Sequence, residues 1–431
     1  MYIPKHSVGA AGILCVELTT NSIAMKTSIN YFSRVLCALM LCTGFAFTGC
    51  TDDPLGDNQN TEQDGNETPD QGETPDQGGN EGGSTDDPST SIDYVNLSAT
   101  SSANCYIVSE SGLYKFATVK GNSNESVGDV SSVEVLWESF GTLHTPNEGD
   151  LIKSVSYKDG YGNLQTADTF KEGNAVIAAK DASGNILWSW HIWLTDQPQG
   201  QEYYNNSGTM MDRNLGATSA APGDVEALGL LYQWGRKDPF LGSSSIYSDS
   251  MADAKSTITW PSAVASDSDS GTIDYATANP TTYITKNSSN SDWYYTGSST
   301  TDNTRWTESS AAKSIYDPCP AGWRVPDGGS NGVWSKALGS SSYISYTFDT
   351  SNRGMNLYEK LGSASTIWYP ASGQRGADDG LLKNVGSNGF CWSATILSYY
   401  GYRLTVNWGE MLSPSDGCTR AVAQSVRCIQ E

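Results

Sequence analysis

The sequence is poor in the residues on which metal and hydrolytic sites usually depend. It has three histidines among 431 residues, and only His144 and His191 lie beyond residue 49. Beyond that residue, no two cysteines have the C-x₂₋₄-C spacing of structural zinc sites. A zinc site is therefore not expected, and a Ser-His-Asp triad would have to use His144, in a loop, or His191, in a strand-like run. We predict no metal, no cofactor and no catalytic residue.

Basic residues are also scarce. The chain has 25 Lys and Arg against 48 Asp and Glu, which gives a net charge of -23. Because phosphate binding needs clustered Lys and Arg, we expect no nucleic acid partner, and anionic membrane surfaces are disfavoured for the same reason. A pair of catalytic carboxylates stays open as an alternative, since spacing in sequence does not give spacing in space.

Long hydrophobic runs are almost absent, and none reaches the ~20 apolar residues that a membrane span needs. One shorter run, 35–47, follows the basic residues Lys26 and Arg34 and ends at the small residues before Cys50. This is the layout of a secretory signal, with Met25 as the expected translation start and 1–49 as the signal region. The small residues and Cys50 resemble the lipobox of bacterial lipoproteins, which implies a lipidated Cys50. The alternative is a plain signal peptide.

An acidic linker is expected to follow the lipid. Residues 51–93 contain thirteen Asp or Glu and no Lys or Arg, and 67–72 repeats at once as 73–78. A segment so poor in apolar residues cannot offset its ordering entropy, so 50–91 reads as a disordered stalk. Its acidic start resembles the surface-export signal of Bacteroidetes lipoproteins. Two acyl chains anchor firmly, so we predict a protein held by lipid on the surface of the outer membrane.

Residues 92–196 have the pattern of an all-β domain. Turn signals such as 110–112, 158–160 and 181–185 separate short β-rich runs, which predicts a β-sandwich. Within the last run, Trp188 and Trp190 share one face of a strand and Trp193 lies on the other, which favours a role in the core. The predicted strands cover 105–108, 113–119, 133–137, 151–157, 175–179 and 186–194.

Residues 197–431 read as a second, larger unit with little helical periodicity. We predict one helix over 225–234, a shorter one over 334–338, and a long polar loop region over 243–312. Asp267 and Asp269 approach a calcium loop, but Gly271 stands at a ligand position and no Glu follows at the twelfth place, so an ordinary polar loop is expected.

Several motifs of this second unit occur in a specific order. They are Met211-Asp-Arg-Asn-Leu215, Leu231-Tyr-Gln-Trp-Gly235, Asp317-Pro-Cys319-Pro-Ala-Gly-Trp323-Arg-Val-Pro326, Gly389-Phe-Cys391-Trp-Ser393 and Ser425-Val-Arg-Cys428. Together they resemble the Fibrobacter succinogenes major paralogous domain of Bacteroidetes surface proteins, over roughly 205–431. That family resembles C-type lectin-like folds and the formylglycine-generating enzyme. The fold implied is mainly β, with a loop-rich, C-type-lectin-like α+β terminal domain after the sandwich.

The sequence lacks residues on which the activities of those relatives depend. The closely spaced copper-binding cysteines of the enzyme are missing, and so are the Glu-Pro-Asn, Gln-Pro-Asp and Trp-Asn-Asp strings of calcium-dependent lectins. Neither activity is carried over. The lectin-like pattern implies a long disulfide, Cys319–Cys428, and an inner one, Cys391–Cys418. Cys105 is left over in an apolar strand and reads as a buried free thiol.

Aromatic and polar side chains gather near the end of the chain and are our candidate ligand-binding residues. Exposed aromatic rings beside amides and carboxylates suit both sugars and protein partners, although these aromatics could instead form the core of a loop-rich fold. The candidates are Arg324, Trp334, Trp392, Tyr399, Tyr400, Asn407, Trp408 and Glu410.

The anchor and the resemblance together imply an adhesin that binds a glycan or a host or microbial surface protein without performing chemistry. One version is the tip subunit of a fimbrium, with other fimbrial subunits as partners and a sandwich that accepts a neighbour's strand. The alternatives are a glycan-capture lipoprotein of a polysaccharide-uptake system and, third, a carbohydrate-active enzyme.

Overall fold

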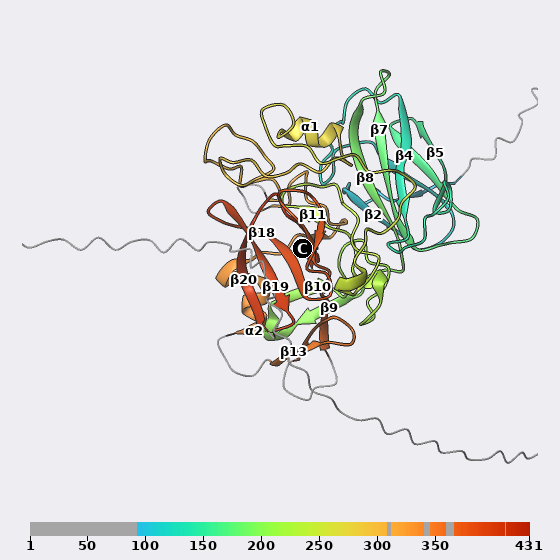
Figure 1. Cartoon of the computed structure of the whole chain (residues 1–431). Coiled ribbons are helices and arrows are strands. Elements are labelled where there is room, and N and C mark those ends of the chain that lie inside the picture. Colours follow the sequence, from blue (N-terminus) through green and yellow to red (C-terminus); the bar gives the residue numbers. More distant parts are fainter. Residues whose placement is uncertain (1–92, 308–311, 340–344, 359–365, 410) are drawn as a thin grey trace, which may run out of the picture. The chain divides into compact units, whose positions relative to one another are not determined.

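Short strands and long loops dominate the computed structural model of the chain (Figure 1). The structure describes residues 93–307, 312–339, 345–358, 366–409 and 411–431. The predicted signal region, Cys50, nearly all of the linker and Glu410 lie outside the described residues. The part of the chain that the structure describes is mainly β, as predicted, with its strands divided among several small sheets.

Two four-stranded sheets form between residues 95 and 194. Most neighbouring strands are antiparallel, while β1 with β3 and β2 with β8 are parallel. The first sheet has the order β1 (Val95–Asn96), β3 (Leu113–Ala117), β6 (Tyr161–Thr166), β5 (Ile152–Lys158). The second has the order β2 (Cys105–Val108), β8 (Ile186–Leu194), β7 (Gly173–Lys180), β4 (Ser132–Ser139).

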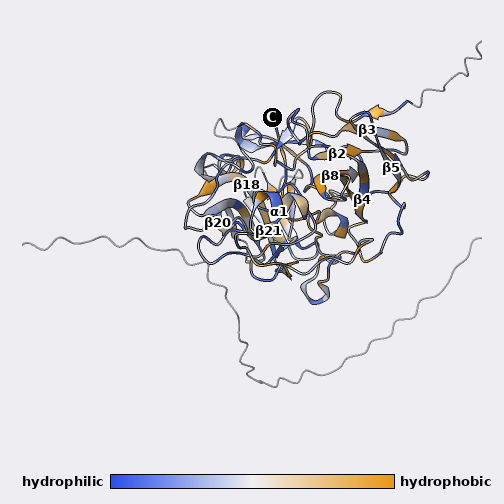
Figure 2. Cartoon of the chain, turned by 90° about the horizontal axis from the view of Figure 1, so that it is seen from above, coloured by the Kyte–Doolittle hydropathy of each residue, from blue (hydrophilic) through white to orange (hydrophobic). Residues whose placement is uncertain are grey.

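The two sheets share one hydrophobic cluster. Phe116 of the first sheet lies 5.4 Å from the ring of Tyr106 and 5.0 Å from that of Trp190, both in the second sheet. Trp188 belongs to the same cluster, whereas Trp193 belongs to a cluster built mainly from residues beyond 210. Strand β8 is therefore buried on both faces, and Figure 2 shows hydrophobic segments around it.

The remainder of the chain builds four further small sheets. Two of them combine strands that are far apart in sequence: β12 (Trp323–Arg324), β22 (Ile429–Gln430), β10 (Gly208–Met211), β9 (Gly200–Tyr203), and β11 (Tyr232–Gln233), β21 (Ala423–Gln424), β16 (Gln374–Arg375), β17 (Leu382–Lys383). The other two are antiparallel meanders: β13 (Ser345–Asp349), β14 (Gly354–Tyr358), β15 (Thr366–Pro370), and β18 (Asn388–Leu397), β19 (Tyr400–Asn407), β20 (Met411–Thr419).

Helices are short. The α-helices are α1 (Ile273–Ala278) and α2 (Val333–Leu338), and the single-turn 3₁₀ helices are η1 (Tyr204–Asn206), η2 (Val225–Ala227), η3 (Ser248–Ser250) and η4 (Gly329–Asn331). Helix α2 confirms the helix predicted over 334–338. None of the helices among the described residues has the length and apolar character of a membrane span.

The helix predicted over 225–234 is wrong. Only the turn η2 forms there, and the chain then enters β11, which pairs with β21. Gly229 between them has φ +71, and a β-carbon added there would lie 2.9 Å from the carbonyl oxygen of Leu215. A left-handed glycine in close contact with another backbone ends the helix, a cause that hydrophobic periodicity does not show.

The polar loop region predicted over 243–312 is observed, apart from η3 and α1, in the residues described there, and it carries part of the core. Trp293 and Trp306 are buried in it, together with the ion pair of Asp292 and Arg305. The Arg305 guanidinium lies over the ring of Trp234, 5.0 Å from its centroid, and over that of Trp293, 4.8 Å away. Stacked guanidinium and indole groups thus take the place of a purely aliphatic interior.

Residues 91–431 form one compact unit. The amide nitrogen of Asn104 donates to the carbonyl oxygens of Ile315, at 2.7 Å, and Asp317, at 2.9 Å. The buried ammonium of Lys237 donates to the Ser189 carbonyl oxygen at 3.0 Å. Hydrogen bonds therefore cross the boundary predicted between residues 196 and 197.

Candidate functional site

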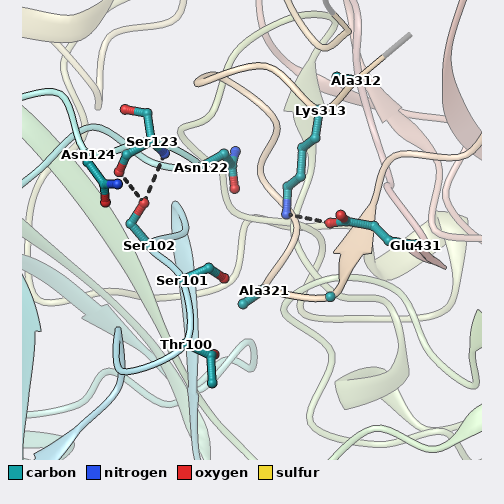
Figure 3. Close-up of a pocket in the computed structure, with 11 residues that line it drawn as sticks. Thr100, Ser101, Ser102, Asn122, Ser123, Asn124, Ala312, Lys313, Ala321 and Glu431 are labelled. Atoms are coloured by element: carbon teal, nitrogen blue, oxygen red, sulfur yellow. Dashed lines mark hydrogen bonds and ion pairs between the residues drawn. The ribbon is translucent and has the colours of Figure 1, made fainter.

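One cavity among the described residues is a polar pocket of about 410 Å³ beside β2 and the segment that follows residue 311 (Figure 3). We call it the serine–asparagine pocket. It is lined by Thr100, Ser101, Ser102, Asn122, Ser123, Asn124, Ala312, Lys313, Ala321, Gly322 and Glu431.

Several polar groups of this pocket already have hydrogen-bond partners. The Lys313 ammonium donates to the carbonyl oxygens of Cys319, Pro320 and Trp323 at 3.0, 2.9 and 2.5 Å. It also lies 3.6 Å from Oε1 of Glu431. Because an ammonium has three N–H donors, its hydrogen-bonding capacity is already used. These contacts join neighbouring loops, so the pocket is better explained as a structural contact between loops than as a ligand site.

The second cavity combines aromatic rings with charged groups. It has a volume of about 400 Å³, within the range of small-molecule sites. The residues come from the loops that follow β11 and from the turn between β16 and β17. We call it the aromatic pocket. Its lining consists of Phe240, Leu241, Asp253, Trp260, Pro261, Ser262, Ala263, Thr281, Tyr283, Arg375, Asp379, Gly380 and Leu381.

The aromatic wall of this pocket is rigidly supported. Phe240 meets Tyr283 edge to face at 5.1 Å and lies 6.1 Å from Trp260. Tyr283 donates its hydroxyl proton to the Ala421 carbonyl oxygen at 2.7 Å, and burial raises the pKa of that hydroxyl. Phe240 and Tyr283 are buried, whereas Trp260 is half-buried. Its ring also lies 5.6 Å from that of Trp137 and its indole N–H donates to Ser256, so only the remaining exposed part of the ring is open to a ligand.

A single guanidinium organises the charged side of the aromatic pocket. Arg375 donates from Nε to the Leu241 carbonyl oxygen at 2.9 Å and from Nη1 to that of Gly380 at 2.8 Å. Its Nη2 donates to Oδ1 of Asp253 at 2.9 Å. Asp379 stands on the same rim, 3.2 Å from the Lys383 ammonium. Aromatic surface beside fixed donors and acceptors suits a ligand with one apolar face and several hydroxyls.

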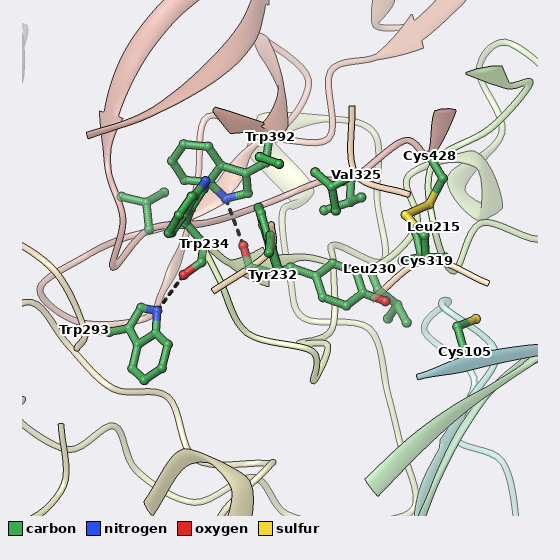
Figure 4. Packing of buried hydrophobic residues seen from close by; sticks show 14 of the residues in the cluster. Cys105, Leu215, Leu230, Tyr232, Trp234, Trp293, Cys319, Val325, Trp392 and Cys428 are labelled. Atoms are coloured by element: carbon green, nitrogen blue, oxygen red, sulfur yellow. Dashed lines mark hydrogen bonds between the residues drawn. A yellow bond between two sulfur atoms is a disulfide. The ribbon is translucent and has the colours of Figure 1, made fainter. Parts of the chain in front are cut away.

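Two of the aromatic residues predicted to bind ligand are core residues, which corrects that prediction. Trp334 is 1% exposed and Trp392 is 0% exposed. Trp392 donates its indole proton to the Tyr232 carbonyl oxygen at 3.0 Å and lies among the buried aromatics drawn in Figure 4. Trp334 donates to the Tyr369 hydroxyl at 2.8 Å. Both indoles are used in packing, so neither can stack on a ligand.

The other predicted residues do not form one surface. Tyr399 and Trp408 are 47% and 61% exposed, but they flank the opposite ends of β19. Eight strand residues at 3.3 Å each place them roughly 25 Å apart. Tyr400 and Asn407 are the half-buried end residues of that strand. Arg324, in β12, pairs with Asp327 at 2.8 Å.

The disulfide prediction is half confirmed. Cys319 and Cys428 are bonded, across a sequence separation of 109. The bridge expected between Cys391 and Cys418 is wrong, since these two buried cysteines are not bonded to each other. They lie on β18 and β20, the two outer strands of one sheet. Two strand spacings are about 9.6 Å, beyond the roughly 4.4–6.8 Å that a disulfide spans between Cα atoms.

The surroundings of Cys105 and His191 indicate structural roles. Cys105 is a buried free thiol, as predicted. His191 shares a 2.9 Å hydrogen bond with Oδ1 of Asn174, and burial lowers its pKa to about 3. Its partner is an amide and not the carboxylate of a triad, and His144 is exposed.

In the loop that resembles a calcium-binding motif, backbone amides of the same loop donate to the carboxylate of Asp267. Oδ1 of Asp267 accepts from the amide nitrogens of Asp269 and Ser270, both at 2.9 Å. Within the described ranges, no group of three or more acidic, histidine or cysteine side chains is placed to hold a metal ion.

Sequence reasoning missed the aromatic pocket. One usable signal was Trp260-Pro261, an isolated large aromatic within a polar loop region. Comparisons of the chain with protein-family models, curated proteins and solved structures found no match. The function must therefore be argued from the site itself.

Proposed function

We propose that this chain is a surface-exposed, lipid-anchored adhesin that binds a glycan in the aromatic pocket. The observation that carries the proposal is the pairing of the half-buried Trp260 with the fixed Arg375 and Asp253 in one cavity. A pyranose ring presents the matching surfaces, with C–H groups on a face and hydroxyls around the edge.

The wider architecture is part of the same proposal. The two sheets between 95 and 194 would be a sandwich with an assembly role, and the remainder a lectin-like domain with a ligand-binding role. The acidic linker and Cys50 would hold both away from the membrane. In its most specific form, the protein is the tip subunit of a fimbrium.

Trp260→Ala tests the pocket directly. We expect the affinity of the full chain for a glycan chosen from an array to fall about tenfold or more, because a buried aromatic face contributes on the order of 1.5–3 kcal/mol. Isothermal titration calorimetry measures the affinity, and thermal unfolding verifies that the variant is folded.

The matched control is Trp408→Ala, which removes the same side chain from an exposed turn that does not line the pocket. It should bind the glycan as the unaltered chain does. Loss of binding in the Trp408 variant alone would place the site at β19 and overturn our assignment. Release of new reducing ends from the bound glycan would favour the carbohydrate-active enzyme instead.

The location of the protein on the cell distinguishes a fimbrium tip subunit from a glycan-capture lipoprotein. Immunogold electron microscopy with an antibody to residues 320–431 is expected to label filament ends. Even label over the cell surface, without filaments, would contradict the tip subunit and favour a glycan-capture lipoprotein.

A further inference from the structure

The guanidinium of Arg375 is held in place before any ligand arrives. Two of its contacts are backbone carbonyl oxygens, those of Leu241 and Gly380, and its side chain is 11% exposed. A guanidinium has five N–H donors. Counting only acceptors in the part of the chain that the structure describes, three donors have a partner. Two donors are therefore available on a group that needs little further ordering to bind.

A hydrogen-bond acceptor stands directly beside these donors. Asp253 uses Oδ1 for Arg375, and its side chain is 56% exposed, so the carboxylate is open to a ligand. A hydroxyl group can accept from a guanidinium N–H and donate to a carboxylate at the same time. The adjacent pair therefore matches two neighbouring hydroxyls on one rigid ring.

The charge around the pocket does not favour an anion. The one cation among the lining residues, Arg375, is already paired with Asp253. The second lining carboxylate, Asp379, is paired with Lys383, so these described lining residues offer an anion no unpaired cation. A uronate or sulfate that accepted from the two remaining donors would lie close to the Asp253 carboxylate, which would repel it.

The apolar surface restricts the shape of the ligand. Trp260 is half-buried, and Leu381 on the same rim is 62% exposed. Such surfaces match the C–H face of a ring and offer little to an open-chain polyol.

From these features we infer that the aromatic pocket selects an uncharged pyranose unit with two adjacent free hydroxyls, and discriminates against acidic sugars. This inference rests on the proposed function. Asp253 and Arg375 hydrogen-bond the two hydroxyls, and Asp253 also disfavours anions because its carboxylate repels them and compensates the charge of Arg375.

The test compares two oligosaccharides of equal length and linkage, one of galactose and one of galacturonic acid, on the full chain by calorimetry. We expect the neutral chain to bind about tenfold or more tightly than the acidic one, because like charges in a partly desolvated site repel. In Asp253→Ala, affinity for the neutral chain should fall about tenfold or more with the loss of a charge-assisted hydrogen bond. Affinity for the acidic chain should rise, because the repelling carboxylate is removed and the charge of Arg375 is no longer compensated.

Asp378→Ala is the matched control, since it removes an exposed carboxylate nearby that pairs with Lys286 and does not line the pocket. Both affinities should stay unchanged in it. If Asp253→Ala proves unfolded, Asp253→Asn serves in its place. Equal binding of both oligosaccharides to the unaltered chain would overturn the inference while leaving the glycan site intact. Failure to bind any glycan on an array would overturn the proposed function itself.

Discussion

Asp292→Ala is expected to lower the free energy of unfolding by about 3–5 kcal/mol, as removal of one partner from a buried ion pair usually does. Asp292, Arg305 and Arg420 all have fully buried side chains. The carboxylate of Asp292 accepts from the Arg305 guanidinium, with a 3.2 Å bond from Nη1, and lies 3.8 Å from Nη1 of Arg420.

The reason for so large an effect is the second arginine. Burial and the nearby Arg305 lower the pKa of Arg420 to about 10. Without Asp292, two like charges would face each other in an interior of aromatic rings. The ring of Trp234 lies 5.0 Å from the Arg305 guanidinium and 4.4 Å from that of Arg420, and stacking cannot replace a counter-ion.

Chemical denaturation followed by tryptophan fluorescence measures the effect. Asp168→Ala is the control, because it removes the exposed partner of Lys153, and such surface pairs are worth about 1 kcal/mol or less. An equal, small loss in both variants would show that the buried carboxylate contributes no more than a surface one.

Removal of the Cys319–Cys428 disulfide should lower the free energy of unfolding by a similar amount. The sequence separation is 109, and a closed loop of that length is worth about 4–5 kcal/mol in the chain-entropy description. The bond ties the residues just before β12 to those just before β22, two strands that pair with each other. It lies beside buried Leu215 and Val325 (Figure 4).

The double variant Cys319→Ala, Cys428→Ala is compared with the unaltered chain in denaturant, with and without a reductant. The unaltered chain should lose stability in the reductant, and the double variant should not respond to it. Cys105→Ala, which removes a buried free thiol, is the control and should keep the response. A reductant-insensitive unaltered chain would contradict the prediction.

Local patterns predicted β2, β3, β4, β5, β7 and β8, but not β6. That strand contains Gly162 and Asn163, residues that strands usually avoid, and it exists because it pairs with β3 on one side and β5 on the other. A β-carbon added at Gly162 would lie 2.8 Å from the Phe116 ring. The glycine is therefore explained by a contact 46 positions away in sequence, which no local pattern contains.

The sequence by itself determined the mainly β character and the short helix α2, because these follow from local composition and turn signals. The long disulfide was implied only by the resemblance to the lectin-like pattern, and the inner bridge that the same resemblance implied is wrong. The signal, the lipid on Cys50 and the stalk stay predictions. Only the tertiary structure decided which aromatics face solvent. Trp392 donates its indole proton to the carbonyl oxygen of Tyr232, 160 positions away, and Arg375 pairs with Asp253, 122 positions away. Burial and ion pairing at such separations depend on how distant segments pack, so the pocket could not be read from neighbouring residues.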